Sequence, residues 1–179
     1  MVSDRVAADP SDHYAALVAK VDAFVDRVTA RHAADLRCRA GCARCCHARL
    51  TVTTVEAAAI EGWAAAQPAA TRAAIAEAAR AEPGPRCAAL DDDDRCRIYA
   101  ARPLVCRSHG IPIRLRARGL PVVTACTLNF TAHGPEAADA DCILDQTLVS
   151  TTLGVIERAA GGDPAHRIDL ARLLAALAP

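Results

Sequence analysis

The chain has 179 residues, of which 53% are hydrophobic and only 3% aromatic. This length is sufficient for a hydrophobic core, so we expect a single domain over residues 1–179 that folds without disulfide support. The 21 basic residues balance the 21 acidic ones, and few aromatic side chains are present for stacking. We therefore expect no nucleic-acid partner.

Nothing in the sequence predicts a membrane segment. Residues 1–10 carry aspartates where a signal peptide needs a long apolar stretch, and prolines and polar residues interrupt the uncharged stretch 119–135. We therefore expect no membrane partner and a cytoplasmic, reducing environment. Cysteine clusters there bind metal or perform redox chemistry more often than they form structural disulfides.

Helical signals dominate the first half of the chain. Apolar residues recur at helical spacing over 11–36, with Ser11 or Asp12 available as the N-cap. Further along, Thr53 and Glu56 have the spacing of a capping box, which predicts a helix through the alanine-rich run that follows. Glu56 is therefore interpreted as a helix cap and not as a catalytic acid.

The middle of the chain is different. A helix is predicted over 69–82, and Pro83-Gly84-Pro85 ends it. Residues 86–129 show little helical periodicity and contain four aspartates at 91–94, which we interpret as a solvated turn. Within this segment, 111–124 predicts one short β-hairpin whose prolines suit edge strands.

Helices return in the C-terminal part, over 135–178. One is predicted over 135–160, closed by Gly161-Gly162, and a last one begins with Asp163 as N-cap and Pro164 at its first position. The expected fold class is mainly α: a small helical domain with a cysteine-rich, loop-rich metal-binding core over 35–130 and one short hairpin.

Nine cysteines provide the strongest functional signal, and an odd number cannot all pair internally. Four of them fall within nine residues in the pattern CxxxCxxCC, and local pairs of this kind aim several sulfurs at one ion. More distant cysteines, or His109, would complete such a site. The four close cysteines are Cys38, Cys42, Cys45 and Cys46, and the others are Cys87, Cys96, Cys106, Cys126 and Cys142.

An alternative is that the four close cysteines lie on one buried face of a helix as small hydrophobic residues. Gly41 would cost about 1 kcal/mol inside such a helix, and Arg39 and Arg44 give the thiols little apolar company. We favour metal binding. Its free energy, on the order of 10 kcal/mol in small zinc peptides, is sufficient to order the coil-like segment 86–129.

The combined motifs resemble a known family. CxxxCxxCC followed by C-x-I-Y-x-x-R-P-x-x-C-R over 96–107 is similar to the YkgJ-type cysteine-cluster proteins, described as zinc- or iron-chelating or as iron-sulfur proteins. The resemblance covers about 35–130 and implies metal binding by Cys38, Cys42, Cys45, Cys46, Cys87, Cys96, Cys106 and Cys126. Cys142 lies on a predicted helix beyond the shared pattern and is interpreted as an ordinary buried thiol.

The cofactor implied is an iron-sulfur cluster, of the 4Fe-4S type, or Zn2+, with electron transfer or another redox role. Adjacent Cys45 and Cys46 favour a cluster or two sites, because neighbouring residues tend to point apart and fit one zinc ion poorly. A thiol/disulfide redox enzyme or sensor is the alternative. Flagellin lysine N-methylases are similar around the same block, which adds a methyltransferase-related role, although this chain is much shorter than those enzymes.

Several neighbours of the cysteines have two interpretations. His47 and His109 are either ligands or ordinary surface residues. Arg102 and Arg107 flank Cys106 and either donate hydrogen bonds to thiolates or form ion pairs with aspartates.

Overall fold

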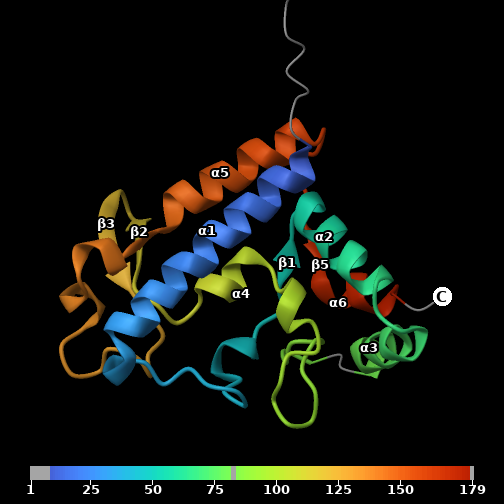
Figure 1. Ribbon diagram of the computed structural model, residues 1–179, viewed down its shortest axis with the longest axis horizontal. Coiled ribbons are helices and arrows are strands. Elements are labelled where there is room, and N and C mark those ends of the chain that lie inside the picture. Colours follow the sequence, from blue (N-terminus) through green and yellow to red (C-terminus); the bar gives the residue numbers. More distant parts are fainter. Residues whose placement is uncertain (1–8, 82–83, 178–179) are drawn as a thin grey trace, which may run out of the picture.

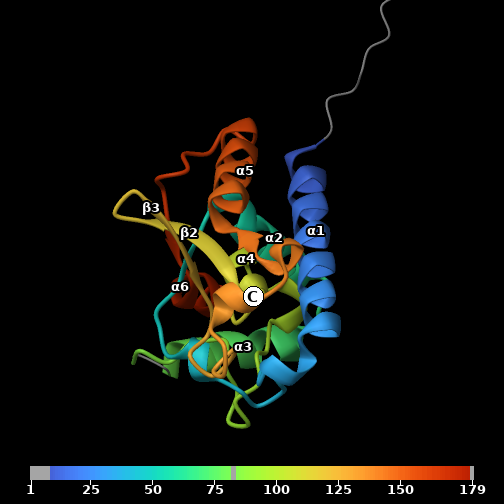
Figure 2. The same cartoon turned by 90° about the vertical axis from the view of Figure 1, so that its left-hand side faces the viewer.

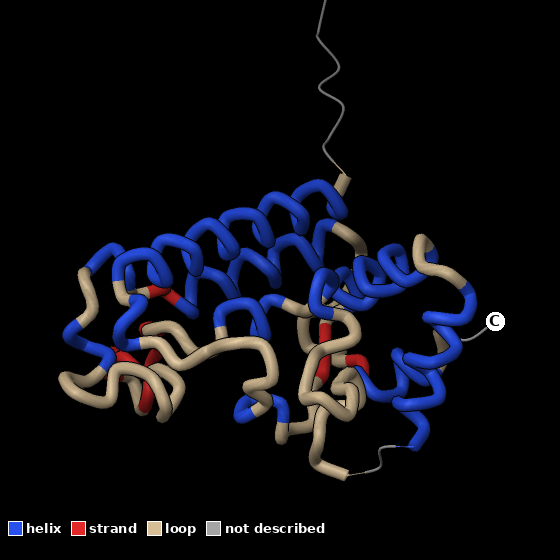
Figure 3. Tube along the Cα trace, turned by 60° about the horizontal axis from the view of Figure 1, so that its bottom comes forward, coloured by secondary structure: helices blue, strands red, loops and turns tan. Residues whose placement is uncertain are grey.

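The computed structural model describes residues 9–81 and 84–177. Across these ranges six α-helices and five short strands are present, so the expectation of a mainly helical fold is confirmed. The two longest helices, α1 (Pro10–Arg31) and α5 (Gln146–Ala159), pack side by side, while α2, α3 and α6 form a second helical part (Figure 1). Long loops run between the two parts (Figure 3). None of the described helices has the length and apolar character of a membrane span.

Helix α1 begins earlier and ends earlier than predicted. Asp9 is its N-cap and accepts a hydrogen bond from the backbone N–H of Ser11 at 2.9 Å, with Pro10 at the first position. The assignment of Ser11 or Asp12 as cap was therefore wrong, because Pro10 suits the first turn, where its missing N–H has no cost. The helix ends at Arg31, and a 3-10 turn follows.

Helix α2 (Thr54–Ala65) confirms the capping box. The Thr53 hydroxyl accepts from the Glu56 N–H, and the Glu56 carboxylate accepts from the Thr53 N–H at 3.0 Å. Glu157 of α5 is also buried here and accepts from the N–H groups of Thr54 and Val55 at 3.1 and 3.0 Å. Two carboxylates thus hold the start of α2.

Helix α3 (Ala69–Ala81) matches its prediction over the described residues, and the predicted end at Glu82 and Pro83 lies outside them. It packs against α6. Ile60, Ile75 and Leu174 come from α2, α3 and α6 and are buried in one apolar cluster. A second cluster unites α1, α4 (Leu104–Ser108) and α5.

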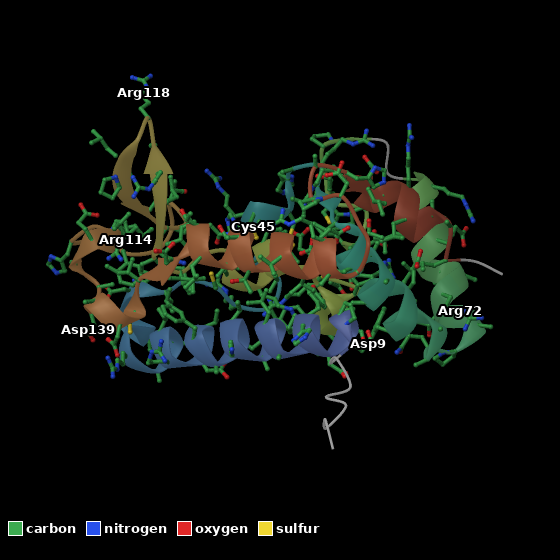
Figure 4. The ribbon with its side chains drawn as sticks, turned by 90° about the horizontal axis from the view of Figure 1, so that it is seen from above. Asp9, Cys45, Arg72, Arg114, Arg118 and Asp139 are labelled. Carbon is green, nitrogen blue, oxygen red and sulfur yellow. The ribbon has the colours of Figure 1, made fainter. Side chains whose placement is uncertain are left out.

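The predicted hairpin is confirmed as β2 (Ile113–Ala117) and β3 (Leu120–Thr124). Arg118 and Gly119 connect them with φ angles of 51° and 83°, as a tight turn with two left-handed residues requires. The hairpin projects away from the α1–α5 pair with Arg118 at its tip (Figures 2 and 4). Strand β4 (Leu144–Asp145) joins β2 in parallel, which leaves β3, with its proline, at the edge.

The helix predicted over 135–160 is wrong in its first half. Two 3-10 turns, Pro135–Ala137 and Ala140–Cys142, and strand β4 occupy 135–145. The Leu144 N–H donates to the Pro112 carbonyl at 2.9 Å, so its backbone pairs with the β2 edge and not with a helix. Helix α5 then begins after Asp145, whose carboxylate is the cap, and ends before Gly161 at φ 78° as predicted.

The last helix also begins later than predicted. Helix α6 (Leu170–Ala175) is capped by Asp169, whereas Asp163 closes only a local turn by accepting from the Ala165 N–H. The chain between them is extended because β5 (Ile168–Asp169) pairs with β1 (Thr51–Val52). The prediction of Asp163 as cap was wrong for this reason.

Candidate metal centre

The four close cysteines lie on turns and not on an α-helix. Cys38 and Cys42 are in the loop that follows α1, and Cys45 and Cys46 belong to a 3-10 turn. Gly41 has a φ of 83°, a left-handed conformation that interrupts any helix. The alternative of four thiols on one helix face was therefore wrong.

Backbone hydrogen bonds bring the next two cysteines to this turn. The Cys87 N–H donates to the Cys46 carbonyl at 2.7 Å, although the two residues are 41 positions apart. Leu90 and Cys96 form an antiparallel bridge. The bridge is closed by Asp91, whose carboxylate accepts from two backbone N–H groups of the loop, at 3.0 and 2.8 Å. The tetra-aspartate is thus the solvated turn that was predicted.

Glu56 positions Cys106. One carboxylate oxygen closes the α2 capping box, and the other accepts from the Leu104 N–H at 3.1 Å, at the start of α4. Because Cys106 lies on this five-residue helix, a single buried side chain fixes α4 against α2. The sequence indicated the capping box but not this second bond.

Five thiols interact with one another electrostatically. Burial raises the pKa of Cys106 to about 12, and the charges of Cys87 and Cys96 add to this shift. Burial also raises the pKa of Cys87 and of Cys96. These residues, together with the pair at 45 and 46, are called the Cys87 group: Cys45, Cys46, Cys87, Cys96 and Cys106.

Cys45 and Cys46 differ strongly in acidity. Their sulfurs are 3.9 Å apart, and the hydrogen bond between them lowers the pKa of Cys45 to about 6 while it raises the pKa of Cys46. His109 and Arg102 also lower the pKa of Cys45 through their charge. Cys45 lies near the middle of the molecule, between the hairpin and the α2–α3 part (Figure 4).

The remaining predicted cysteines form a looser set, the Cys38 group, defined as Cys38, Cys42 and Cys126. Burial raises the pKa of Cys38, and the charges of Cys126, Cys42 and Cys45 act in the same direction. Cys45 therefore interacts with both groups.

Asn129 organises the Cys38 loop. Its side-chain nitrogen donates to the Cys38 sulfur at 3.3 Å and to the Gly110 carbonyl at 2.8 Å, and its oxygen accepts from the Arg37 N–H at 2.8 Å. Sequence reasoning missed this buried residue. The available signal was a polar side chain three positions after Cys126 in an otherwise uncharged stretch.

Of the eight sulfurs, those of Cys45 and Cys46 are in contact at 3.9 Å. Among the residues that the structure describes, no three of them lie within 4.8 Å of one another. The eight thiols come from five separate segments of the chain, and in the described residues they do not form a compact set of three.

The flanking arginines have different roles. Arg102 stacks on Tyr99 with its guanidinium carbon 4.1 Å from the ring centre, and it interacts electrostatically with Cys45, Cys96 and Cys106. Its buried Nε atom has no hydrogen-bond partner in the described part of the chain. Arg107 instead forms a 2.7 Å ion pair with Asp22 of α1, so it supports the fold.

Cys142 is fully buried, as expected, but it ends a 3-10 turn and does not lie on a helix. The two histidines near the cysteines lie in different surroundings. His109 is exposed and interacts electrostatically with Cys45. His47 lies beside Cys42 in a shallow surface depression.

Residues 37–118 match a family model named CxxCxxCC, described as a putative zinc- or iron-chelating domain. The matched segment contains seven of the eight cysteines and ends before Cys126. No curated protein and no solved structure matches the chain.

Proposed function

Since residues 37–118 belong to the CxxCxxCC family of cysteine-cluster domains, we propose that this protein binds an iron-sulfur cluster and serves in electron transfer or another redox reaction. Cys46, Cys87, Cys96 and Cys106 would hold the cluster. The observation that carries the proposal is the mutual electrostatic interaction of these thiols, two of which, Cys96 and Cys106, also interact with Arg102, whose buried Nε–H lacks an acceptor in the described part of the chain. Thiolates bound to metal would accept that hydrogen bond, and the positive charge of Arg102 would stabilise them.

A cluster and a single zinc ion need different sulfur spacings. Around one tetrahedral zinc with bonds of about 2.3 Å, the ligand sulfurs stand about 3.8 Å apart. In a cluster each thiolate binds a different iron, so the sulfurs stand farther apart. Among the described residues no three thiol sulfurs lie within 4.8 Å of one another, so the ligand set of a single zinc ion is not preformed.

The pKa shifts bear on how such a site is loaded. Burial raises the pKa of Cys87, Cys96 and Cys106, so these thiols are protonated at neutral pH before metal binds. Metal binds thiolates, and loading therefore releases protons and becomes more favourable as the pH rises.

Cys45 would belong to a second set of four thiols, with the Cys38 group. Its charge raises the pKa of Cys38, and it follows Cys38 and Cys42 in the CxxxCxxC spacing. Adjacent Cys45 and Cys46 would then serve two different sites. This second set would hold zinc or a second iron-containing group.

Anaerobic purification, an absorbance spectrum and analysis of iron, sulfide and zinc test the proposal. We expect brown protein whose visible absorbance decreases on reduction, and a Cys96→Ser variant that loses this iron. Cys126→Ser should keep it and lose only metal held by the second set. Colourless protein with stoichiometric zinc would refute the cluster.

A thiol redox function is the second candidate, and the Cys45–Cys46 pair favours it. Cys45, with a pKa of about 6, is a thiolate at neutral pH, and the Cys46 thiol is 3.9 Å away. If this function is correct, protein isolated without metal keeps its fold and, by exchange with an added disulfide such as oxidised glutathione, which is reduced to its thiol, forms a reversible 45–46 disulfide detected by mass spectrometry.

A further inference from the structure

A second group of metal-binding side chains lies apart from the clustered cysteines, at the C-terminal end of α1. Ligand atoms of His32, Asp139 and Cys142 all lie within 4.8 Å of one another. Figure 4 shows Asp139 at this end of the helix, away from Cys45. The three side chains come from two segments more than 100 residues apart in sequence.

The spacing of the ligand atoms fits one small ion. The His32 Nε2 atom is 3.6 Å from the nearer Asp139 carboxylate oxygen. A tetrahedral ion with bonds of about 2.1 Å separates its nitrogen and oxygen ligands by about 3.4 Å. The side chains therefore need only small movements to bind it.

The imidazole of His32 is held in the orientation that a ligand requires. Its Nδ1 atom lies 3.8 Å from the Asp35 carboxylate, and Phe130 packs at 5.4 Å between ring centres. The backbone N–H of Asp139 donates to Nε2 at 3.4 Å, and a bound ion would replace this long hydrogen bond. A carboxylate behind the far nitrogen is the usual companion of a metal-bound histidine.

Cys142 supplies the soft ligand. Its side chain is fully buried, yet among the described residues its sulfur makes no hydrogen bond. Asp139 is 57% exposed on the other side of the site, so an ion has a path from solvent. Burial of Cys142 also argues against a nucleophilic thiol, because a substrate could not reach it.

Arg31 is the one cation that contacts this group in the described residues. Its Nη1 atom is 3.6 Å from the Asp139 carboxylate but 2.7 Å from that of Asp141. Arg31 can therefore keep its ion pair with Asp141 when Asp139 binds a metal ion.

We propose that His32 Nε2, Asp139 and Cys142 form a second, independent metal site for a zinc-class divalent ion, with Asp35 as the positioning residue for His32. Nitrogen, sulfur and oxygen together suit zinc or cobalt and not magnesium or calcium. The fourth position is open to water. The bound ion would tie the end of α1 to the 3-10 turn before β4.

Cobalt(II) added to the full-length protein, isolated anaerobically and washed with chelator, tests the site. We expect the wild type to bind one equivalent beyond any that the clustered thiols take up, with its own thiolate-to-cobalt absorbance. His32→Gln and Asp139→Asn should abolish this additional equivalent, and Cys142→Ser should remove its share of the absorbance. Asp35→Asn should weaken binding about 10- to 100-fold. His13→Gln, at an exposed histidine of α1, is the matched control and should bind like the wild type.

The result distinguishes this site from the clustered cysteines. Iron content should stay unchanged in His32→Gln and Asp139→Asn, whereas Cys96→Ser should lose iron and keep the cobalt equivalent. Because Asp139 is exposed, its variant tests the site even if Cys142→Ser does not fold. Equal cobalt binding by wild type, His32→Gln and Asp139→Asn would overturn the proposal.

Discussion

Glu56 connects fold stability to the candidate metal centre, and the Glu56→Gln substitution tests this connection. The side chain is 3% exposed, and its two oxygens accept from the backbone N–H groups of Thr53 and Leu104. Glutamine has the same shape but only one acceptor oxygen. One of the two buried N–H groups therefore loses its partner.

The expected cost follows from that lost bond. A buried donor left unpaired costs about 1–3 kcal/mol, and a weakened N-cap costs about 1 kcal/mol. With a urea m-value of about 2 kcal/mol/M, a loss of about 2 kcal/mol moves the unfolding midpoint down by about 1 M. Because Leu104 begins the helix that carries Cys106, we also expect lower iron content.

Urea unfolding followed by circular dichroism, together with metal analysis of the protein as isolated, measures both effects. Glu61→Gln is the matched control, since Glu61 lies exposed on the same helix, and its effect should stay within about 0.5 kcal/mol. If Glu56→Gln were as stable and as rich in iron as this control, the role assigned to Glu56 would be wrong.

Three further substitutions test the neighbouring contacts. Burial opposes ionisation of Glu157, but its hydrogen bonds lower the pKa below the ordinary 4.5. The ionised side chain therefore stabilises the fold fully above pH 4.5, and this stabilisation is lost as the pH falls through the lowered pKa of the folded state. In urea unfolding, Glu157→Gln should be less stable than the wild type at pH 7, and the difference in unfolding free energy should become smaller in acid. Asn129→Asp should cost about 1–3 kcal/mol of stability in the same assay. It should also slow the alkylation of Cys38, measured by mass spectrometry, because a carboxylate facing the sulfur raises the pKa of that thiol. Gly110→Ala places a methyl group 2.8 Å from the Cys38 sulfur at a φ of 103°. We expect this variant to lose about 1–3 kcal/mol of unfolding free energy and the metal of the second thiol set. Full stability and metal content would contradict the packing described.

The features predicted correctly from the sequence are those whose causes are local. The capping box of Thr53 and Glu56 depends on residues three positions apart, and the hairpin depends on the turn at Arg118 and Gly119. The cysteine pattern was recognised for the same reason, since its spacing is itself the family signature. Local chemistry alone decides these features.

The wrong predictions concern segments in which distant partners override local signals. Asp163-Pro164 is a good helix start, but the β1–β5 pairing keeps the following residues extended and moves the helix start to Leu170. The segment 135–145 lost its predicted helix to pairing with the β2 edge. Asn129 and the second bond of Glu56 were missed because each depends on a partner 48 or more residues away.

The CxxxCxxCC motif is thus not a self-contained set of four thiols, because it interacts with later cysteines in two directions. The Cys46 carbonyl receives the N–H of Cys87, which brings the later cysteines to one side of the turn. On the other side, Cys45 shares its electrostatic environment with Cys38, whose loop is held by Asn129 after the hairpin. The Cys45 and Cys46 thiols of this one short turn are in contact with each other, and between them they interact with both groups, whose remaining members come from other parts of the fold. In the proposed arrangement, Cys46, the fourth cysteine of the motif, is the residue that extends the site from one metal-binding set to two.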